Sequence, residues 1–194
     1  CYNSASITVE NSMTVGGIIG YETGSPSYLN NDYNVNTGTI TGESYVAGII
    51  GYAGTKFPSF GCCANYGTIN ATGGAVGLIS NSSSSGINIS GCLSAGSKEV
   101  INKCYVVDAN ASITYSIYDS TILVVDDVNI IAKSTSSVVH GHTTQELISG
   151  EVPEEFVDVV DTEYSFAEGR YPIPDIKDAL PDGYWEKIVD YVTP

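Results

Sequence analysis

Hydrophobic residues occur along most of the chain in groups of two or three, separated by runs of Gly, Asn, Ser and Thr. The groups are rich in Ile, Val and Tyr, which favour strands, whereas the separating residues favour turns. No stretch before residue 140 places apolar residues at the i, i+3, i+4 spacing of an amphipathic helix. The apolar runs also fall far short of the ~18 residues of a membrane-spanning helix. The pattern therefore predicts many short strands joined by turns.

Three segments of the chain resemble one another at nearly equal intervals. Each begins with a short element that contains Asn, at Asn3, Asn34 and Asn65. Each continues into a Gly-containing apolar element, at 15–20, 46–51 and 75–80. Self-similarity at a fixed period indicates an architecture in which each repeat stacks on the next. We therefore expect a mainly β fold, a parallel β-helix or solenoid of about 30-residue repeats.

Stacked parallel strands place equivalent residues about 4.8 Å above one another, so each repeated position becomes a ladder of similar side chains. The expected interior apolar ladder consists of Ile18, Ile49 and Leu78. A glycine ladder, where a close backbone approach excludes a Cβ, is expected at Gly17, Gly48 and Gly77. An amide ladder, in which each side chain bonds the next, is expected at Asn3, Asn34 and Asn65. Tyr21 and Tyr52 are expected to stack on the outside.

The regular spacing changes after the third repeat. A weaker fourth start at Cys92 keeps the interval of the repeat from Cys63, but Cys104 follows much sooner, so a full coil over 81–103 stays an open question. We expect Cys63, Cys92 and Cys104 near one position of successive turns. The cysteine count of five is odd and no C-x-x-C pattern occurs, so we expect free buried thiols, with the disulfide state left open.

Composition changes near residue 139. The segment 143–194 contains 13 of the 22 acidic residues and only three basic ones. The pair Thr143 and Glu146 has the spacing of a capping box before a short helix, and Gly150 is a suitable stop. Further helices are expected at 153–160 and 181–192, whereas the alternation over 113–117 predicts one half-exposed strand. We therefore divide the chain into a β-solenoid region, 1–139, and an acidic C-terminal cap segment packed on it, 140–194.

The repeats resemble the GLUG-type repeats of bacterial surface and secreted proteins. The elements at 15–20 and 46–51 match the Val-Gly-Gly-Ile-Ile-Gly element of that family, and 75–80 is a degenerate copy. The stretch 104–107 resembles the last coil of such proteins, and 143–147 with 171–173 resemble the helix and closing strand that follow it. The resemblance implies a right-handed β-solenoid in an adhesin-like protein, located outside the cell or on its surface. It transfers no catalytic residue.

The chain has a formal net charge of −15 and a single arginine, Arg170. Nucleic acid is therefore excluded as a partner, because its phosphates must be neutralised by Lys and Arg. An anionic membrane surface is disfavoured for the same reason. A lyase acting on uronates would also need cations to neutralise the carboxylates of its substrate, and this chain supplies few.

Two weak metal-site candidates occur. His140 and His142 share one face of a predicted strand and, with Glu146 as a third ligand, have a spacing that can hold a metal, but an ordinary polar loop is the favoured interpretation. A calcium site would need acids from the set Glu151, Glu154, Glu155, Asp158 and Asp161. This set lacks the D-x-D-x-D-G loop pattern, so a solvated acidic face is favoured. No cofactor and no catalytic residue is expected.

These observations predict a non-catalytic segment of a bacterial cell-surface or secreted protein that serves as an adhesive module, stalk or spacer. Its contact surface would be a lateral face rich in Tyr, Ser and Thr. The expected partners are host glycans, matrix proteins or other domains of the same chain, and the N-terminal turn can pack end to end with another copy. Two alternatives stay open: a lyase or glycosidase on a β-helix, and a substrate-binding accessory region of a large secreted peptidase.

Overall fold

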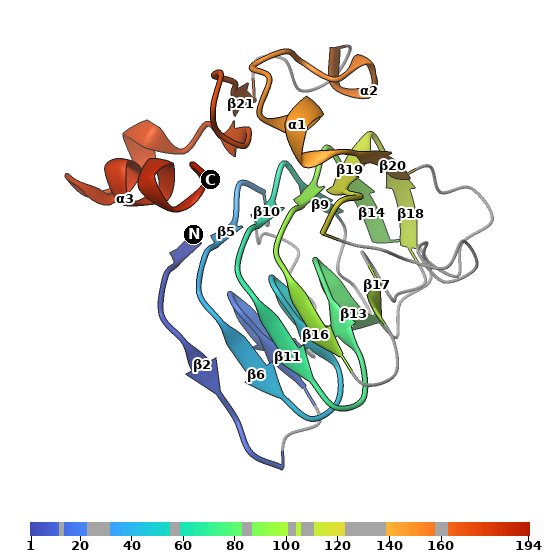
Figure 1. Cartoon of the computed structure of the whole chain (residues 1–194). Coiled ribbons are helices and arrows are strands. Elements are labelled where there is room, and N and C mark those ends of the chain that lie inside the picture. Colours follow the sequence, from blue (N-terminus) through green and yellow to red (C-terminus); the bar gives the residue numbers. More distant parts are fainter. Residues whose placement is uncertain are drawn as a thin grey trace.

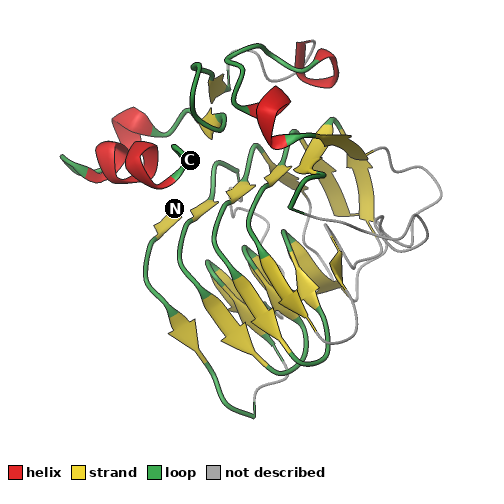
Figure 2. Cartoon of the chain, viewed as in Figure 1, coloured by secondary structure: helices red, strands yellow, loops and turns green. Residues whose placement is uncertain are grey.

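We analysed a computed structural model, which describes residues 1–11, 14–22, 32–54, 59–82, 87–100, 104–105, 111–122, 139–157 and 163–194. These residues form a mainly β structure whose short strands associate into parallel sheets, with a few short helices near the C-terminus (Figures 1 and 2). The arrangement is compatible with a β-helix-like fold, because the chain visits the same sheets in the same order on each successive pass.

Each pass contributes at most one described strand to each sheet. The first pass contains β1 (Tyr2–Asn3), β2 (Ile7–Thr8), β3 (Val15–Gly16) and β4 (Ile19–Tyr21). The second contains β5 (Val35–Asn36), β6 (Ile40–Gly42), β7 (Val46–Ala47), β8 (Ile50–Ala53) and β9 (Ser59–Gly61). The third contains β10 (Ala64–Asn65), β11 (Ile69–Ala71), β12 (Ala75–Val76), β13 (Ile79–Ser82) and β14 (Ile87–Ser90). The fourth contains β15 (Leu93–Ser94), β16 (Lys98–Val100), β17 (Cys104–Tyr105) and β18 (Ala111–Thr114), after which β19 (Ser116–Asp119) and β20 (Val139–His142) follow.

We name the parallel sheets by their strands. Sheet A contains β1, β5, β10, β15, β19 and β20, and sheet B contains β2, β6, β11 and β16. Sheet C contains β3, β7, β12 and β17, sheet D contains β4, β8 and β13, and sheet E contains β9, β14 and β18. Since β20 pairs with β19 through residues 139–142, the strand continues past residue 139, where we had expected the solenoid region to end.

The apolar and glycine ladders follow the expected positions. The backbone N–H of Ile18 donates to the Ile49 carbonyl at 3.0 Å, and that of Ile49 donates to the Leu78 carbonyl at 3.2 Å. Ile49 and Leu78 are completely buried. A Cβ added to Gly17 would lie 2.2 Å from the Gly48 carbonyl oxygen, and one added to Gly48 would lie 2.4 Å from the Gly77 carbonyl oxygen, so the backbones approach too closely for any side chain here.

The amide ladder has a different second member from the one we expected. Asn3 pairs with Asn36, and Asn36 pairs with Asn65. The Nδ2 of Asn3 donates to Oδ1 of Asn36 at 2.7 Å, and the Nδ2 of Asn36 donates to Oδ1 of Asn65 at 2.8 Å. The assignment of Asn34 to this ladder was wrong, because the first register step in sheet A is two residues longer than the interval between Val15 and Val46 in sheet C.

Glycines flank this amide ladder on both sides. A Cβ at Gly48 would lie 2.3 Å from the Asn65 carboxamide, and one at Gly17 would lie 2.9 Å from that of Asn36. On the opposite side, the Nδ2 atoms of the three asparagines lie within 2.8 Å of the Cβ positions of Gly38, Gly67 and Gly96. Asn36 and Asn65 are completely buried, so the two glycine columns provide the space in which the amides stack.

Each later pass enters sheet A through a sharp corner. The corner residues have left-handed backbone, with φ of 58° at Tyr33, 48° at Cys62, 61° at Gly91 and 49° at Tyr115. This corner divides the single strand expected over 113–117 into β18 and β19. The prediction was wrong there because the corner at Tyr115 turns the chain from sheet E into sheet A. Both Ile113 and Ile117 are therefore buried.

A second ladder follows directly after these corners. The backbone N–H of Asn34 donates to Cys63 Sγ at 3.1 Å, that of Cys63 to Cys92 Sγ at 3.5 Å, and that of Cys92 to Ser116 Oγ at 3.2 Å. Cys63 and Cys92 are buried, reduced cysteines in adjacent passes. Cys104 does not belong to this ladder, because it lies in β17 and pairs with Ala75 in sheet C. The short segment between Cys92 and Cys104 is the path from sheet A to sheet C within one pass.

The stretch 81–103 takes part in a complete pass. Its described residues run from β13 through β14 and β15 to β16, and so visit sheets D, E, A and B. The spacing shortens only afterwards: successive members of the second ladder are 29 residues apart from Cys63 to Cys92 but 24 apart from Cys92 to Ser116. The stretch 104–107 was compared with a last coil, but Cys104 and Tyr105 continue the fourth pass. Residues 123–138 lie outside the described part of the chain.

The C-terminal segment, residues 143–194, contains α1 (Thr144–Leu147), α2 (Glu154–Val157), β21 (Tyr164–Ser165), β22 (Ile173–Pro174), the 3-10 helix η1 (Lys177–Ala179) and α3 (Tyr184–Tyr191). The capping box of Thr143 and Glu146 is formed, and Gly150 adopts φ of 85°. Both features agree with the sequence prediction. Strands β21 and β22 pair antiparallel.

This segment covers the outer face of sheet A lengthwise and does not close an end of the stack. In Figure 1 it leaves β20, passes over the sheet through α1 and β21, and reaches α3 beside the N-terminus. Its buried residues pack on outward residues of four passes, namely Val35, Ala64, Leu93 and Ile117. At its far end, the Tyr184 ring contacts Tyr2 of β1 edge to face, with centroids 6.1 Å apart. We call residues 143–194 the C-terminal cover.

Candidate functional site

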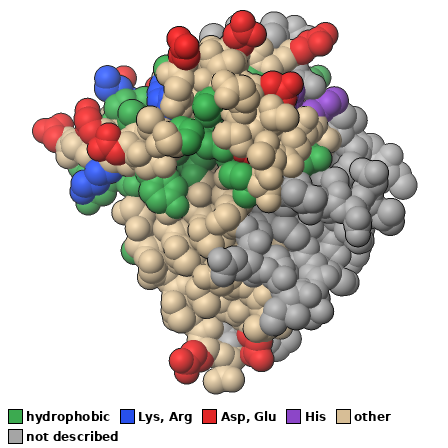
Figure 3. Space-filling view, viewed as in Figure 1, with side chains coloured by type: hydrophobic (Ala, Val, Ile, Leu, Met, Phe, Trp, Pro, Cys, Tyr) green, Lys and Arg blue, Asp and Glu red, His purple; other side chains and the backbone are tan. Residues whose placement is uncertain are grey.

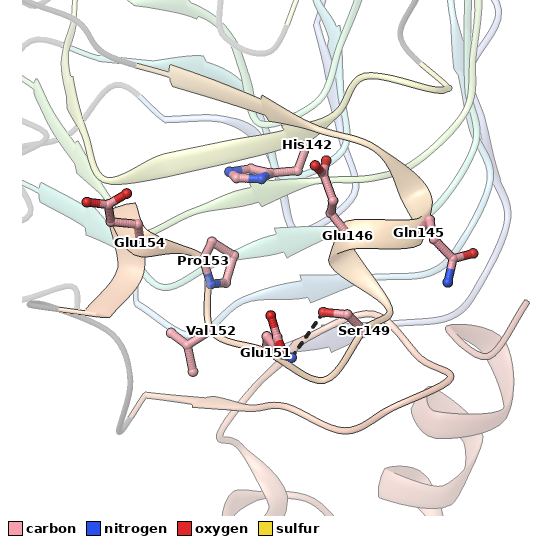
Figure 4. A pocket seen from close by; sticks show the side chains of 8 residues that line it. All are labelled: His142, Gln145, Glu146, Ser149, Glu151, Val152, Pro153 and Glu154. Atoms are coloured by element: carbon pink, nitrogen blue, oxygen red, sulfur yellow. Dashed lines mark hydrogen bonds between the residues drawn. The ribbon is translucent and has the colours of Figure 1, made fainter.

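Two surfaces combine several of the residues that the sequence singled out. The first is an open polar hollow of about 460 Å³ between β20, α1 and α2. Figure 4 shows its lining side chains, which are His142, Gln145, Glu146, Ser149, Glu151, Val152, Pro153 and Glu154. The hollow therefore combines one histidine of the weak candidate metal-binding pair with two acids of the weak candidate calcium set.

The carboxylate of Glu146 is already engaged at this hollow. Its Oε2 accepts the backbone N–H of Thr143 at 2.7 Å and the Thr143 hydroxyl at 2.9 Å. These hydrogen bonds lower the pKa of Glu146, and the neighbouring His142 acts in the same direction. Glu146 is thus a helix cap that stays ionised, a poor choice for the proton-donating acid of a glycosidase.

The remaining candidate ligands are only partly brought together. Glu151 and Glu154 are exposed at the rim of the hollow, and the backbone N–H of Glu151 donates to Ser149 Oγ at 3.1 Å. His140 pairs with Ile117 in sheet A and does not line the hollow. Asp158, Asp161 and the side chain of Glu155 lie outside the described part of the chain. Within the described ranges, no group of three His, Cys, Asp or Glu residues is arranged to hold a metal ion.

The second surface is the outer face of sheet B. Along its strands the residues alternate: Ile40 and Ile69 are completely buried, whereas their neighbours in sequence point outward. The outward residues form two columns, Ser6, Thr39, Thr68 and Ser97, and Thr8, Thr41 and Asn70. We call these seven residues the hydroxyl face. In Figure 3 the described part of the lower region is coloured mainly as neither hydrophobic nor charged, with acidic side chains at its lower edge.

An exposed aromatic pair lies on a different sheet. Tyr21 of β4 and Tyr52 of β8 are in register, and their rings stack with centroids 4.8 Å apart and planes at 22°. Tyr21 is 59% exposed. The external tyrosine stack expected from the repeat is therefore present. Its rings cover each other's inner faces, so only edges and outer faces remain for a ligand.

The only arginine has a structural position. Arg170 Nη1 donates to the carbonyl oxygens of Ser165 and Tyr171, at 3.1 and 3.2 Å, and its Nη2 donates to Ser165 Oγ at 2.8 Å. The guanidinium therefore braces the loop between β21 and β22. It does not lie on a parallel sheet, where a polysaccharide lyase on this fold would need it.

The junction between sheet A and the C-terminal cover contains buried polar contacts that sequence reasoning missed. The Tyr164 hydroxyl donates to the carbonyls of Cys63 and Gly91, at 3.2 and 3.0 Å. The Cys62 thiol donates to Glu163, and the Tyr66 hydroxyl donates to the Pro172 carbonyl. The partners are up to 106 residues apart, so no local spacing pattern indicates them.

Burial determines the protonation of this junction. Desolvation raises the pKa values of Tyr66 and Tyr164, so both remain neutral donors. Desolvation, followed by the adjacent Glu163, also raises the pKa of the Cys62 thiol. A thiol kept protonated in this way is a weak nucleophile. The junction is therefore a structural seam, and the two outer surfaces are the candidate binding sites.

Among the helices that the structure describes, none has the length and apolar content needed to traverse a bilayer. No protein-family profile, no curated protein and no solved structure matches the chain.

Proposed function

We propose that this chain is a right-handed β-solenoid segment of a bacterial cell-surface or secreted protein, related to the GLUG-type repeat proteins, and that it serves as a non-catalytic adhesive or spacer module. The observation that carries the proposal is the ladder Asn3–Asn36–Asn65, held between two glycine columns. These asparagines occur once in each of the first three passes, and their side chains hydrogen-bond to one another between passes. Such a stack is stiff along its axis and presents repeated outward side chains, as an adhesive rod requires.

Two further features support an extracellular binding role. The outward positions of β2, β6 and β11 in sheet B are hydroxyl and amide side chains that can hydrogen-bond to a partner without any charge. The thiols of Cys63 and Cys92 are buried within the stack, where their sulfur atoms accept backbone N–H groups. These thiols need no reducing environment for their structural role, because they are shielded from oxidants as long as the stack is folded.

The proposal is tested by immobilising the purified chain on beads and measuring retention of the beads on glycan-coated and matrix-protein-coated surfaces. Beads carrying an unrelated protein of similar negative charge provide the control for nonspecific repulsion. Retention above that control supports an adhesive module. Retention equal to the control on every surface contradicts adhesion and leaves a spacer role, which is then tested by deleting the segment from its parent protein.

A carbohydrate-active enzyme is the second candidate, and the acidic rim of the polar hollow is the observation that favours it. Glu151 and Glu154 are the carboxylates to test there, since Glu146 is engaged as a helix cap. Turnover of any member of a polysaccharide panel, lost in Glu151→Gln or Glu154→Gln, would replace the adhesive proposal with an enzymatic one.

A further inference from the structure

We propose that the hydroxyl face binds a neutral, extended polysaccharide chain that lies along the axis of the stack, with about one sugar over each pass. This inference rests on the proposed adhesive function and assigns it a surface, a ligand class and an orientation.

The first argument is the charge of the surface. The seven residues of the hydroxyl face carry no ionisable side chain, although the whole chain has a net charge of −15. The next position of the second column, in register with Asn70, is the ionisable residue Glu99 of β16, so this column ends one pass before the first. An anionic partner binds to Lys and Arg side chains, and a cationic partner binds to Asp and Glu side chains. None of the seven residues of the hydroxyl face has such a side chain. A neutral partner that presents many hydroxyl groups is complementary to it.

The second argument is the hydrogen-bonding chemistry. Thr68 and Ser97 share a hydrogen bond of 2.8 Å between their hydroxyl oxygens, and Asn70 Nδ2 donates to Thr41 Oγ1 at 3.4 Å. Two pairs of side chains are thus linked across neighbouring strands, and their hydroxyls retain further donor or acceptor capacity. The Oδ1 atom of Asn70 is shielded from solvent and lacks a partner among the described residues.

The third argument is the period of the surface. Parallel strands repeat every 4.8 Å or so along the stack. One hexose of an extended β-linked chain advances by a similar length, so each pass meets one sugar, and every second sugar of a two-fold chain presents the same edge to the face. The first column is continuous over four passes, from Ser6 through Thr39 and Thr68 to Ser97. The face is therefore long enough for about four sugars.

The experiment measures binding of the whole chain to cello- and chito-oligosaccharides of two to six sugars by calorimetry, and to insoluble cellulose and chitin by sedimentation. We expect affinity to rise with length up to about four sugars and then to level off. The triple variant Thr8→Val, Thr41→Val and Thr68→Val removes three hydroxyls at nearly constant volume, and we expect it to weaken binding about tenfold or more. The matched control, Tyr21→Ser with Tyr52→Ser, changes sheet D and should bind like the unchanged chain.

The outcomes separate this inference from the proposed function. If the chain binds polysaccharide but the triple variant binds equally well, the hydroxyl face is not the site, whereas the adhesive function survives. Binding lost in the tyrosine variant instead would move the site to sheet D and overturn the inference. If no oligosaccharide binds, the polysaccharide assignment is wrong; retention of the beads on a matrix protein would still support adhesion. Circular dichroism and thermal unfolding confirm that each variant is folded.

Discussion

The hydroxyl of Tyr171 donates to the buried carboxylate of Asp119 and so joins the C-terminal cover to sheet A. Asp119 is completely buried and accepts three further hydrogen bonds, from the Thr144 hydroxyl and from the backbone N–H groups of Thr121 and Ile122. A buried carboxylate is tolerated only when it is well satisfied, and four donors achieve this here. The side chain of Asp119 thus connects the turn after β19, the first residue of α1 and the segment just before β22.

Replacing Asp119 by Ala should therefore lower the free energy of unfolding by about 3–5 kcal/mol, because several buried donors lose their acceptor at once. Tyr171→Phe removes only one donor and should cost about 1–2 kcal/mol. Urea denaturation of both variants checks the prediction. Equal losses in the two would show that Asp119 does not have the central position described.

The amide ladder predicts a large effect at Asn36 and a small one at Asn70. Asn36→Ala leaves the amides of Asn3 and Asn65 without their partners inside the stack and should destabilise it by about 2–4 kcal/mol. Asn70→Ala, on the outer face, should cost under about 1 kcal/mol. Asn36→Ser should recover part of the loss, since Ser94 occupies the same column. A tolerated Asn36→Ala would contradict the ladder.

The buried tyrosines near the junction and the buried thiol of Cys92 predict that the stability is sensitive to alkaline pH. The pKa values of Cys92, Tyr66 and Tyr164 are raised by burial, and burial with Glu163 raises the pKa of Tyr33 to about 12. The unfolded chain releases these protons near pH 8.5 for Cys and 10 for Tyr, as in model peptides. Stability is therefore full below about pH 8.5 and falls as the pH rises, because the unfolded state binds fewer protons than the folded state.

Thermal unfolding measured between pH 7 and 11 checks this prediction, and Tyr164→Phe provides the comparison. The variant loses one hydrogen-bond donor, so it should be less stable at pH 7, but its stability should fall less steeply above pH 9.5 or so. Parallel curves for the two proteins would show that Tyr164 does not contribute to the alkaline loss.

The packing of the cover predicts the effect of a charge on sheet A. Leu93 is completely buried between sheet A and the cover. Leu93→Asp should destabilise the protein by more than about 3 kcal/mol and should expose the segment 143–194 to proteases before the rest of the chain. Limited proteolysis followed by mass spectrometry identifies the first cut. A first cut within sheets B or C would contradict the separate release of the cover.

The sequence was informative wherever a residue position repeats without interruption. Ile18, Ile49 and Leu78 stack as expected because the paths through sheets C and D have equal lengths in successive passes. Asn34 was placed wrongly because the bend between sheets B and C is two residues longer in the first pass, which moves the register in sheet A. Spacing alone does not show which bend contains the additional residues.

The C-terminal cover was predicted in its helices but not in its place. The capping box and the apolar face of the last helix are local features, and Ile188 is buried as the helical spacing requires. The direction in which the segment runs depends on contacts between residues far apart in the sequence, such as Cys62 with Glu163. Such contacts produce no repeating pattern in the amino-acid sequence. The residues of the hydroxyl face could not be identified from the sequence either, because pairing between passes brings them together.

The contact of Tyr2 with Tyr184 has a consequence for the order in which the protein can fold. A simple stack can grow one layer at a time during synthesis, but here Tyr2 gains its aromatic neighbour only after Tyr184 has been made. Until then the outward side chains of sheet A lack part of their apolar cover and face water. We therefore expect the native state to form late and cooperatively, at a rate limited by closing a loop nearly as long as the chain.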